Sequence, residues 1–122
     1  MLSGMEQDWL SYSLGKPGAW RDEPWENDVV AKVGDKIFAF FGAGSDSRPP
    51  SVGVKCGTRE EADLWLDRFP DTASKMAYIG AHGWNTFLLD GRIPDDDIQE
   101  LIDHSYELVV AKLPRSRRPA LS

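Results

Sequence analysis

The segment of residues 27–42, NDVVAKVGDKIFAFFG, decides the fold because it carries the clearest local pattern of the chain. Two runs rich in β-branched and aromatic residues flank the pair Gly34-Asp35. Such a pair supplies the positive φ angles that a tight hairpin turn requires. The segment therefore predicts an antiparallel hairpin over residues 29–41.

A two-residue turn also determines which side chains of the hairpin share a face of the sheet. Pairing outward from the turn places three pairs on one side: Val33 with Lys36, Ala31 with Phe38, and Val29 with Phe40. Two pairs fall on the opposite side: Lys32 with Ile37, and Val30 with Ala39. We expect the side that carries the phenylalanines to face the core.

The chain after the hairpin alternates between strand and helix patterns. The run SVGVKCG places Val52, Val54 and Cys56 on one face, which predicts a third strand with one apolar side. Thr58 and Glu61 then stand in capping-box register, ahead of apolar residues at helical spacing. These apolar residues predict a second helix: Ala62, Trp65, Leu66 and Phe69.

Further strands and helices complete the pattern. Residues 76–79 and 84–90 predict two more strands. The three aspartates after Pro94 suit the start of a third helix, which Pro114 ends. Residues 2–13 carry apolar side chains at roughly helical spacing before the helix-breaking run LGKPG. The order of elements predicts an α+β fold, with an antiparallel sheet and helices packed on one face.

The chain of 122 residues suits one domain with a buried core, and five Trp and five Phe supply aromatic material for it. We expect a single domain over residues 1–114 and a basic, flexible tail over residues 115–122. No apolar run is long enough to span a membrane, and the start MLSGMEQDWL lacks signal-peptide features. A cytoplasmic location is expected, in agreement with the single cysteine, Cys56.

The net charge of −6 is unevenly distributed along the chain. Four positive charges lie near the C-terminus, at Lys112, Arg115, Arg117 and Arg118, so residues 1–111 carry −10. Phosphate contacts supply most of the affinity of proteins for nucleic acid. Nucleic-acid binding therefore requires a local patch of positive charge.

A cysteine–histidine pair is the first catalytic candidate, because Cys56 coexists with His82 and His104. Cys56 shares its strand face with two valines, and free cysteine is among the residues most often buried. We therefore expect Cys56 in the core and His104 at the surface. No catalytic residue is predicted, and the protein is expected not to be an enzyme.

Two acidic runs are candidates for metal binding, since carboxylate oxygens bind hard cations. They comprise Asp22, Glu23, Glu26 and Asp28 in the first run, and Asp95, Asp96 and Asp97 in the second. Aspartates at a helix start more commonly stabilise the helix dipole. The loop GAGSDSRPP lacks the lysine and the following helix of a phosphate-binding loop. No metal, cofactor or nucleotide is therefore expected.

The segment HGWNTFLLDG suggests a binding surface. If Phe87 and Leu89 point into the core, Trp84 lies on the other face, beside Lys32 and Lys55. An aromatic ring among lysines on an open sheet can stack with bases and contact phosphates. The alternative is that Trp84 covers a sheet edge or packs against a loop.

Four segments together resemble the MmcQ/YjbR family of small bacterial proteins. They are LGKPGAW with the following PW, VAKVGDKIFAFFG, VGVKCG, and HGWNTFLLDGRIPDDDIQELIDHSYELVVAKLP. The resemblance covers about residues 12–114. Members of this family are often described as DNA-binding, with a CyaY-like, or frataxin-like, fold and a double wing of hairpins. The resemblance therefore implies an antiparallel sheet with helices on one face, and hairpins that approach DNA.

The resemblance also carries residues over by motif: Lys36 from GDK, Lys55 from VKC, and Trp84 and Asn85 from WN. The SY pair, Ser105 and Tyr106, is expected to be structural, the serine for packing and the tyrosine for anchoring the helix. The predicted nucleic-acid site on the open sheet face comprises Lys32, Lys36, Lys55, Trp84, Asn85 and Arg92. The alternatives are an acidic, frataxin-like metal-binding module and a protein-interaction domain.

Overall fold

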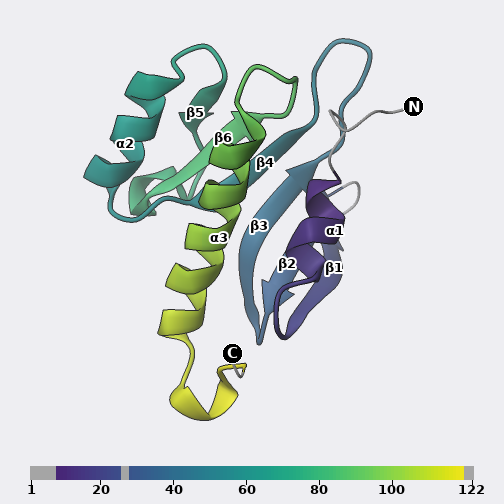
Figure 1. Cartoon of the computed structure of the whole chain (residues 1–122), viewed down its shortest axis with the longest axis vertical. Helices are drawn as coiled ribbons and strands as arrows, with labels where there is room; N and C mark the ends of the chain where they lie inside the picture. The colour runs from purple at the N-terminus through teal and green to yellow at the C-terminus, as the bar shows by residue number, and fades with distance from the viewer. Residues whose placement is uncertain (1–7, 26–27, 120–122) are drawn as a thin grey trace.

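The computed structural model describes residues 8–25 and 28–119. It shows an α+β fold in which one antiparallel sheet of six strands carries three α-helices on one face (Figure 1). The elements are α1 (Trp9–Leu14), β1 (Ala19–Trp25), β2 (Asp28–Val33), β3 (Lys36–Gly42), β4 (Ser51–Lys55), α2 (Arg59–Arg68), β5 (Ala73–Lys75), β6 (Trp84–Leu88) and α3 (Asp95–Lys112). The order across the sheet is β1-β2-β3-β4-β6-β5. The predicted fold class is confirmed.

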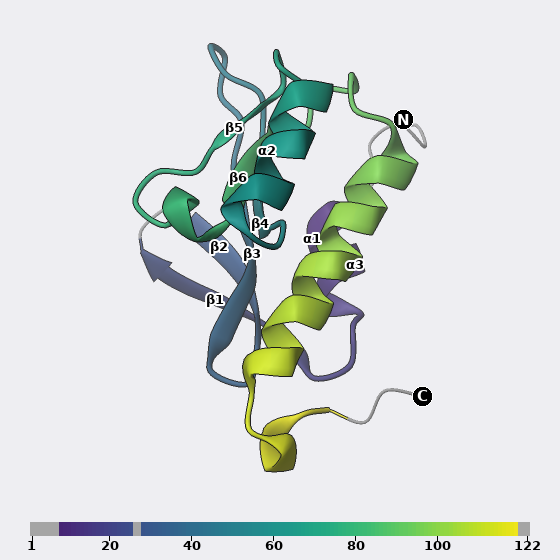
Figure 2. The same ribbon diagram turned by 90° about the vertical axis from the view of Figure 1, so that its left-hand side faces the viewer.

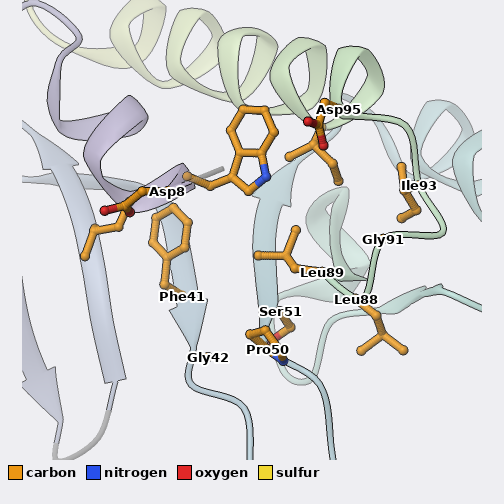
Figure 3. A pocket seen from close by; sticks show the side chains of 13 residues that line it. Asp8, Phe41, Gly42, Pro50, Ser51, Leu88, Leu89, Gly91, Ile93 and Asp95 are labelled. Atoms are coloured by element: carbon orange, nitrogen blue, oxygen red, sulfur yellow. The ribbon is translucent and has the colours of Figure 1, made fainter. Parts of the chain in front are cut away.

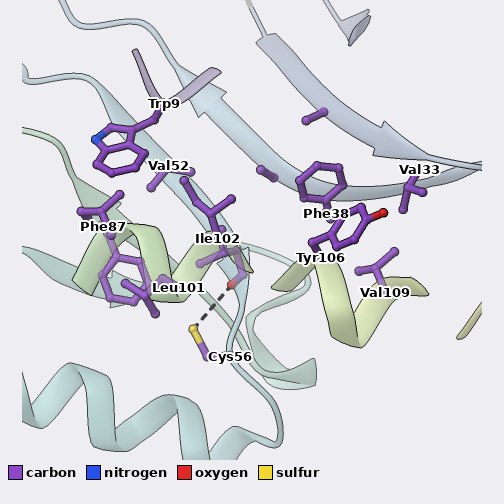
Figure 4. Packing of buried hydrophobic residues seen from close by; sticks show 14 of the residues in the cluster. Trp9, Val33, Phe38, Val52, Cys56, Phe87, Leu101, Ile102, Tyr106 and Val109 are labelled. Atoms are coloured by element: carbon purple, nitrogen blue, oxygen red, sulfur yellow. Dashed lines mark hydrogen bonds between the residues drawn. The ribbon is translucent and has the colours of Figure 1, made fainter. Parts of the chain in front are cut away.

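The core lies between the sheet and the helices, which Figure 2 shows from the side. One buried cluster joins Trp9 of α1, Ala62 of α2 and Ile102 of α3 to the inward side chains of the strands (Figure 4). Phe38 of β3 is fully buried and packs edge-to-face on Tyr106 of α3, with 5.1 Å between the ring centroids. Burial of one such phenylalanine side chain stabilises a fold by about 1.5–3 kcal/mol.

The ends of the second and third helices follow the signals in the sequence. At the start of α2, the Thr58 hydroxyl accepts a hydrogen bond from the Glu61 amide, and the Glu61 carboxylate accepts one from the Thr58 amide. This reciprocal pair satisfies two amide groups that the helix itself leaves without partners. Helix α3 begins directly after Pro94 and ends before Pro114, as predicted.

The sequence predicts a first helix over residues 2–13, and in the described part of the chain this helix, α1, begins at Trp9. Asp8 caps its N-terminus, because the Asp8 carboxylate accepts a hydrogen bond from the amide of Ser11. The earlier part of the predicted helix, residues 2–7, lies outside the described residues. The helix ends where LGKPG predicts, because Leu14 is its last residue.

The hairpin of β2 and β3 is confirmed, with Gly34 at a φ of 60° in its turn. Val33 pairs with Lys36 as predicted, but the register shifts between Lys32 and Ala31. Ile37 and Ala39 have partners on β2, so the residue between them, Phe38, is the extra residue of a β-bulge. Lys32 pairs with Ile37 as predicted, whereas the predicted pairs of Ala31 with Phe38, Val30 with Ala39 and Val29 with Phe40 are wrong.

The bulge also changes which aromatic side chains face the core. Phe38 and its neighbour Ala39 are both fully buried, whereas Phe40 is half-buried and lies against Trp84 on the open face. The prediction that Phe38 and Phe40 share the core side is wrong for Phe40. A bulge inserts one residue, and one residue is enough to reverse the alternation of side chains along a strand.

Ser105 of α3 lies where the ladder between β3 and β4 ends, beside the bulge residue Phe38. The ladder between these strands ends at the pair Ala39 and Val54. Beyond that pair, the Ser105 hydroxyl donates to the carbonyl oxygen of Phe38 at 2.6 Å and accepts from the amide of Lys55 at 3.0 Å. Ser105 is fully buried, as a small packing residue should be, but it also supplies the hydrogen bonds that the ladder lacks.

Two strand assignments differ from the sequence predictions. Residues 76–79 do not form a strand, because Tyr78 has a φ of 65°, which is incompatible with extended backbone. The strand in this part of the chain is β5, which lies earlier, at Ala73–Lys75. Strand β1, Ala19–Trp25, is not predicted by the sequence patterns. Its polar and proline-containing sequence suits an edge strand, where few side chains are buried.

Among the described residues, no helix has the length and the apolar character needed to cross a membrane.

Candidate nucleic-acid interface

The side chains of β6 alternate between the two faces of the sheet as the sequence predicts. Asn85 and Phe87 are fully buried on the helix side, so Trp84 and Thr86 lie on the open face. On the neighbouring strand β4, Lys55 is the register partner of Trp84. The structure therefore brings Trp84 and Lys55 together on the open face.

Both members of this pair are engaged with other groups. The Trp84 ring is half-buried and packs edge-to-face on Phe40, with 5.6 Å between the ring centroids. The ammonium group of Lys55 donates to the carbonyl oxygen of His82 at 2.7 Å. Burial lowers the pKa of Lys55, and the positive charge of Lys112 lowers this pKa further. Lys112 of α3 is thus close enough to influence Lys55.

Lys32 is remote from Trp84, and the predicted grouping of the two is wrong. Three steps between strands of about 4.8 Å each separate β2 from β6, so their backbones lie about 14 Å apart. The Lys32 ammonium group lies 3.3 Å from the Asp22 carboxylate and 4.7 Å from the centroid of the Trp20 ring. The positive charge of Lys32 is therefore already neutralised by the Asp22 carboxylate of β1.

Asn85 cannot contact a ligand on the open face, which corrects its predicted place in the site. Its amide nitrogen donates to the carbonyl oxygen of Ala62 at 2.8 Å. Its amide oxygen accepts from the guanidinium group of Arg59 at 2.7 Å. The same alternation that turns Trp84 outward turns Asn85 inward, so the sequence did contain this signal.

The remaining two predicted residues lie near neither Trp84 nor each other. Arg92 follows β6, near the start of α3, and its guanidinium group forms an ion pair with Asp90 at 2.6 Å. Lys36 is exposed beside the turn of the β2–β3 hairpin. The six predicted residues therefore do not form one surface.

The C-terminal segment creates a different concentration of positive charge. Arg115–Arg117 form a 3-10 turn after α3, and the Arg118 guanidinium group donates to the carbonyl oxygens of Leu113 and Ala111. These bonds satisfy carbonyl groups at the end of the helix. Pro119 lies against Gly18. Arg118 and Pro119, predicted as part of a flexible tail, thus contact the domain, and residues 120–122 lie outside the described ranges.

This turn lies close to the tip of the β2–β3 hairpin (Figure 1). Leu113 is buried, and its side chain is so close to Gly34 that a Cβ added there would lie 3.0 Å from it. We call the exposed cations around this contact the basic end: Lys36, Lys112, Arg115 and Arg117. None of the four has an ion-pair partner within the described ranges.

Acidic groups are concentrated at the other end of α3. Asp95 starts the helix and Lys112 ends it, and a rise of about 1.5 Å per residue puts them about 26 Å apart. Among the described residues, the exposed carboxylates within five positions of a basic-end cation along the chain are Asp35 and Glu107. The acidic start of α3 therefore lies far from Lys112.

The acidic runs show no metal site in the part of the chain that the structure describes, where no three metal-ligating side chains cluster. Asp97 is buried and forms an ion pair with Arg68 at 3.0 Å. In the first run, Asp22 pairs with Lys32 and Glu23 pairs with Arg21. Glu26 of this run lies outside the described residues.

A pocket of about 500 Å³ opens between α1 and the start of α3 (Figure 3). Apolar side chains such as Trp9, Phe41 and Ile93 line its walls, and the carboxylates of Asp8 and Asp95 lie among them. A negative rim disfavours phosphate groups, so this pocket does not suit nucleic acid.

Cys56 lies in the core, as predicted, and both histidines are exposed. Burial raises the pKa of the Cys56 thiol from its ordinary value near 9 to about 12. The thiolate that a nucleophile requires is therefore disfavoured at neutral pH. His104 lies at the surface, in agreement with the sequence.

We expect the stability of the protein to fall above about pH 9. The folded state holds the Cys56 proton more tightly than the unfolded state, and burial likewise raises the pKa of Tyr12 from 10 to about 12. The stabilisation from both groups is present below their unfolded pKa values and is lost as the pH rises toward 12. Urea unfolding between about pH 8 and pH 11 measures this trend. Rapid labelling of Cys56 by a thiol reagent in the native protein at neutral pH would contradict the buried thiol.

Comparisons with known proteins agree with the fold and with the resemblance of the sequence. A family model described as YjbR matches residues 14–108. Two Escherichia coli proteins, both named "Uncharacterized protein YjbR", are 35% identical to the chain over 115 residues, which is 92% of each chain. A solved Deinococcus radiodurans structure has a TM-score of 0.80 at 24% identity and covers 91% of this chain and 83% of its own. A Pseudomonas syringae structure has a TM-score of 0.68 at 23% identity, and the match covers 84% of this chain and 97% of the Pseudomonas chain. The two solved structures support the fold, and the family model and the relatives show that this chain belongs to the YjbR family.

Proposed function

We propose that this protein is a non-enzymatic, cytoplasmic DNA-binding protein that contacts the phosphate backbone through its basic end. One observation carries the proposal: the C-terminal turn folds back beside the hairpin tip and gathers four exposed cations without ion-pair partners among the described residues. The hairpin of β2 and β3 then acts as one wing, with Lys36 at its tip. Lys55, whose pKa responds to Lys112, extends this positive region toward the open face.

The net charge of −6 does not prevent this mode of binding. Electrostatic interactions between exposed charges are largely screened beyond about 10 Å at 0.1 M salt. The aspartates at the start of α3 lie about 26 Å from Lys112, which is more than two such lengths. Asp35 and Glu107 weaken the local field, but the four cations of the basic end outnumber them.

The test is fluorescence anisotropy of a labelled DNA duplex titrated with the full chain at several salt concentrations. Neutralising four phosphates predicts a slope of log affinity against log salt of about −3.6. The double variant Arg115→Glu with Arg117→Glu removes two contacts, so its slope should be smaller by about two and its affinity at least about tenfold lower.

A matched control reverses two charges away from the basic end. The double variant Arg48→Glu with Arg92→Glu changes the net charge by the same amount, and Arg92 lies near the opposite end of α3. We expect it to retain the wild-type slope. Equal weakening in the two double variants, or no salt-dependent binding at micromolar protein, would refute the proposal.

A further inference from the structure

The open face of the sheet carries an apolar groove of about 1010 Å³ that the proposed DNA contact does not use. Its walls come from three segments far apart in the sequence: the end of β1, the loop before β4, and the turn after β5. We call it the outer groove and define it by Trp25, Phe40, Arg48, Met76, Tyr78 and Ile79.

The floor of the outer groove exists because of the bulge in β3. The bulge turns Phe40 to the open face, where Trp25 stacks on it with 6.5 Å between centroids and 19° between ring planes. The next strand presents Gly53, where an added Cβ would lie 3.0 Å from the sulfur of Met76. The glycine thus allows the turn after β5 to lie close to the sheet.

Large side chains in the groove are left open to solvent. Tyr78 is 101% exposed, and Trp25 is 54% exposed. Tyr78 also has a φ of 65°, in the left-handed region that favours glycine. A folded protein gains nothing for its own core from a tyrosine held in this position. Exposed apolar patches on proteins commonly mark interaction sites.

The composition of the groove resembles that of the centre of a protein interface. Such centres are rich in Trp, Tyr, Phe, Met and Arg and poor in Lys, Glu, Asp, Ser and Ala. The residues that line this groove include each of the five favoured types and no Lys, Glu or Asp, although the small residues Ala43, Ser51 and Ala77 also line it. The aliphatic side chains of Met76 and Ile79 suit apolar side chains better than they suit nucleotide bases.

The charges around the groove indicate which partner it fits. Arg48 is the only charged side chain among the residues that line it, and it has no ion-pair partner within residues 8–25 and 28–119. Lys55 is a second cation on the same face, beyond Trp84. A second copy of this chain would bring no carboxylate from its own groove to meet Arg48. We infer that the outer groove docks a segment of another protein in which an aromatic or aliphatic anchor stands next to Asp or Glu.

Selection from a random peptide library displayed on phage tests this inference. The wild-type chain is the target of the selection. A counter-selection against the double variant Trp25→Ala with Tyr78→Ala then discards the peptides that bind outside the groove. We expect the enriched peptides to combine an apolar anchor with Asp or Glu. A synthetic peptide of this kind should bind at least about tenfold more weakly to Tyr78→Ala and to Arg48→Glu.

Trp20→Ala is the matched control, because Trp20 is an exposed aromatic residue of β1 outside the groove. It should bind the peptide as the wild type does, and circular dichroism confirms that each variant is folded. The inference is overturned if enriched peptides bind the double variant equally, if they are basic, or if no peptide is enriched. Displacement of the peptide by an oligonucleotide, or dimerisation of the chain through the groove in sedimentation experiments, would also overturn it.

This inference and the proposed DNA binding can fail independently. Arg115→Glu with Arg117→Glu should leave peptide binding unchanged, because both residues lie outside the groove. Conversely, Tyr78→Ala should leave the affinity for DNA unchanged.

Discussion

Ser105→Ala is expected to lower the free energy of unfolding by about 2–4 kcal/mol, because it leaves two backbone groups without partners. The Ser105 hydroxyl is the hydrogen-bond partner of the Phe38 carbonyl and of the Lys55 amide, in a position where the ladder between β3 and β4 has already ended. Each unsatisfied buried group costs about 1–3 kcal/mol. Chemical denaturation at constant pH measures the loss.

Two further variants separate the hydrogen bonds from the packing around Ser105. Ser105→Cys keeps a side chain of similar shape but bonds weakly, so it should lose most of the same stability. Ser74→Ala removes an exposed serine and should change the free energy of unfolding by less than about 0.5 kcal/mol. If Ser105→Ala is as stable as Ser74→Ala, the bulge does not depend on this hydroxyl.

Asn85→Ala is expected to lower the free energy of unfolding by about 2–4 kcal/mol and to leave the DNA affinity of the folded protein unchanged. The side chain links the backbone of α2, through Ala62, to the guanidinium group of Arg59. Arg59 also donates to the carbonyl oxygens of Gly80 and Trp84, so it holds α2 against the segment before β6. Loss of Asn85 leaves one N–H of the buried end of the Arg59 guanidinium group without its acceptor and removes the side-chain hydrogen bond to the Ala62 carbonyl oxygen, which the helix also engages.

The neighbouring residue provides the control for this experiment. Thr86→Ala changes the open face beside Asn85, and the Thr86 side chain has no hydrogen bond within the described part of the chain. It should have little effect on stability. If Asn85→Ala has wild-type stability but reduced DNA affinity, Asn85 contacts DNA, which would contradict its buried position.

Local signals predicted the elements of this fold well. The capping residues Thr58 and Glu61 mark the start of α2, and Pro94 and Pro114 flank α3. Alternation placed Cys56 in the core and Trp84 on the open face. Strand β1 lacks such a signal, because an edge strand buries few side chains and its sequence has no strong apolar alternation.

The candidate site was harder to predict than the fold. The six predicted residues were chosen by motif, and the sheet order separates Lys32 from Trp84. The cations of the C-terminus were visible in the sequence, but their position beside the hairpin depends on the burial of Leu113 against Gly34. The sequence offers one hint, an apolar leucine between the end of α3 and Pro114 that must pack somewhere.

The sequence by itself determined the three helices, the capping of α2, the β2–β3 hairpin and the faces of β4 and β6, because these depend on residues only a few positions apart. Only the tertiary structure decided the bulge in β3, the exposure of Phe40 and the location of the basic end. At the bulge, the Ser105 hydroxyl donates a hydrogen bond to the carbonyl oxygen of Phe38, 67 positions away in the chain. Contacts over such separations depend on how the whole chain packs, so no local pattern of residues could have specified them.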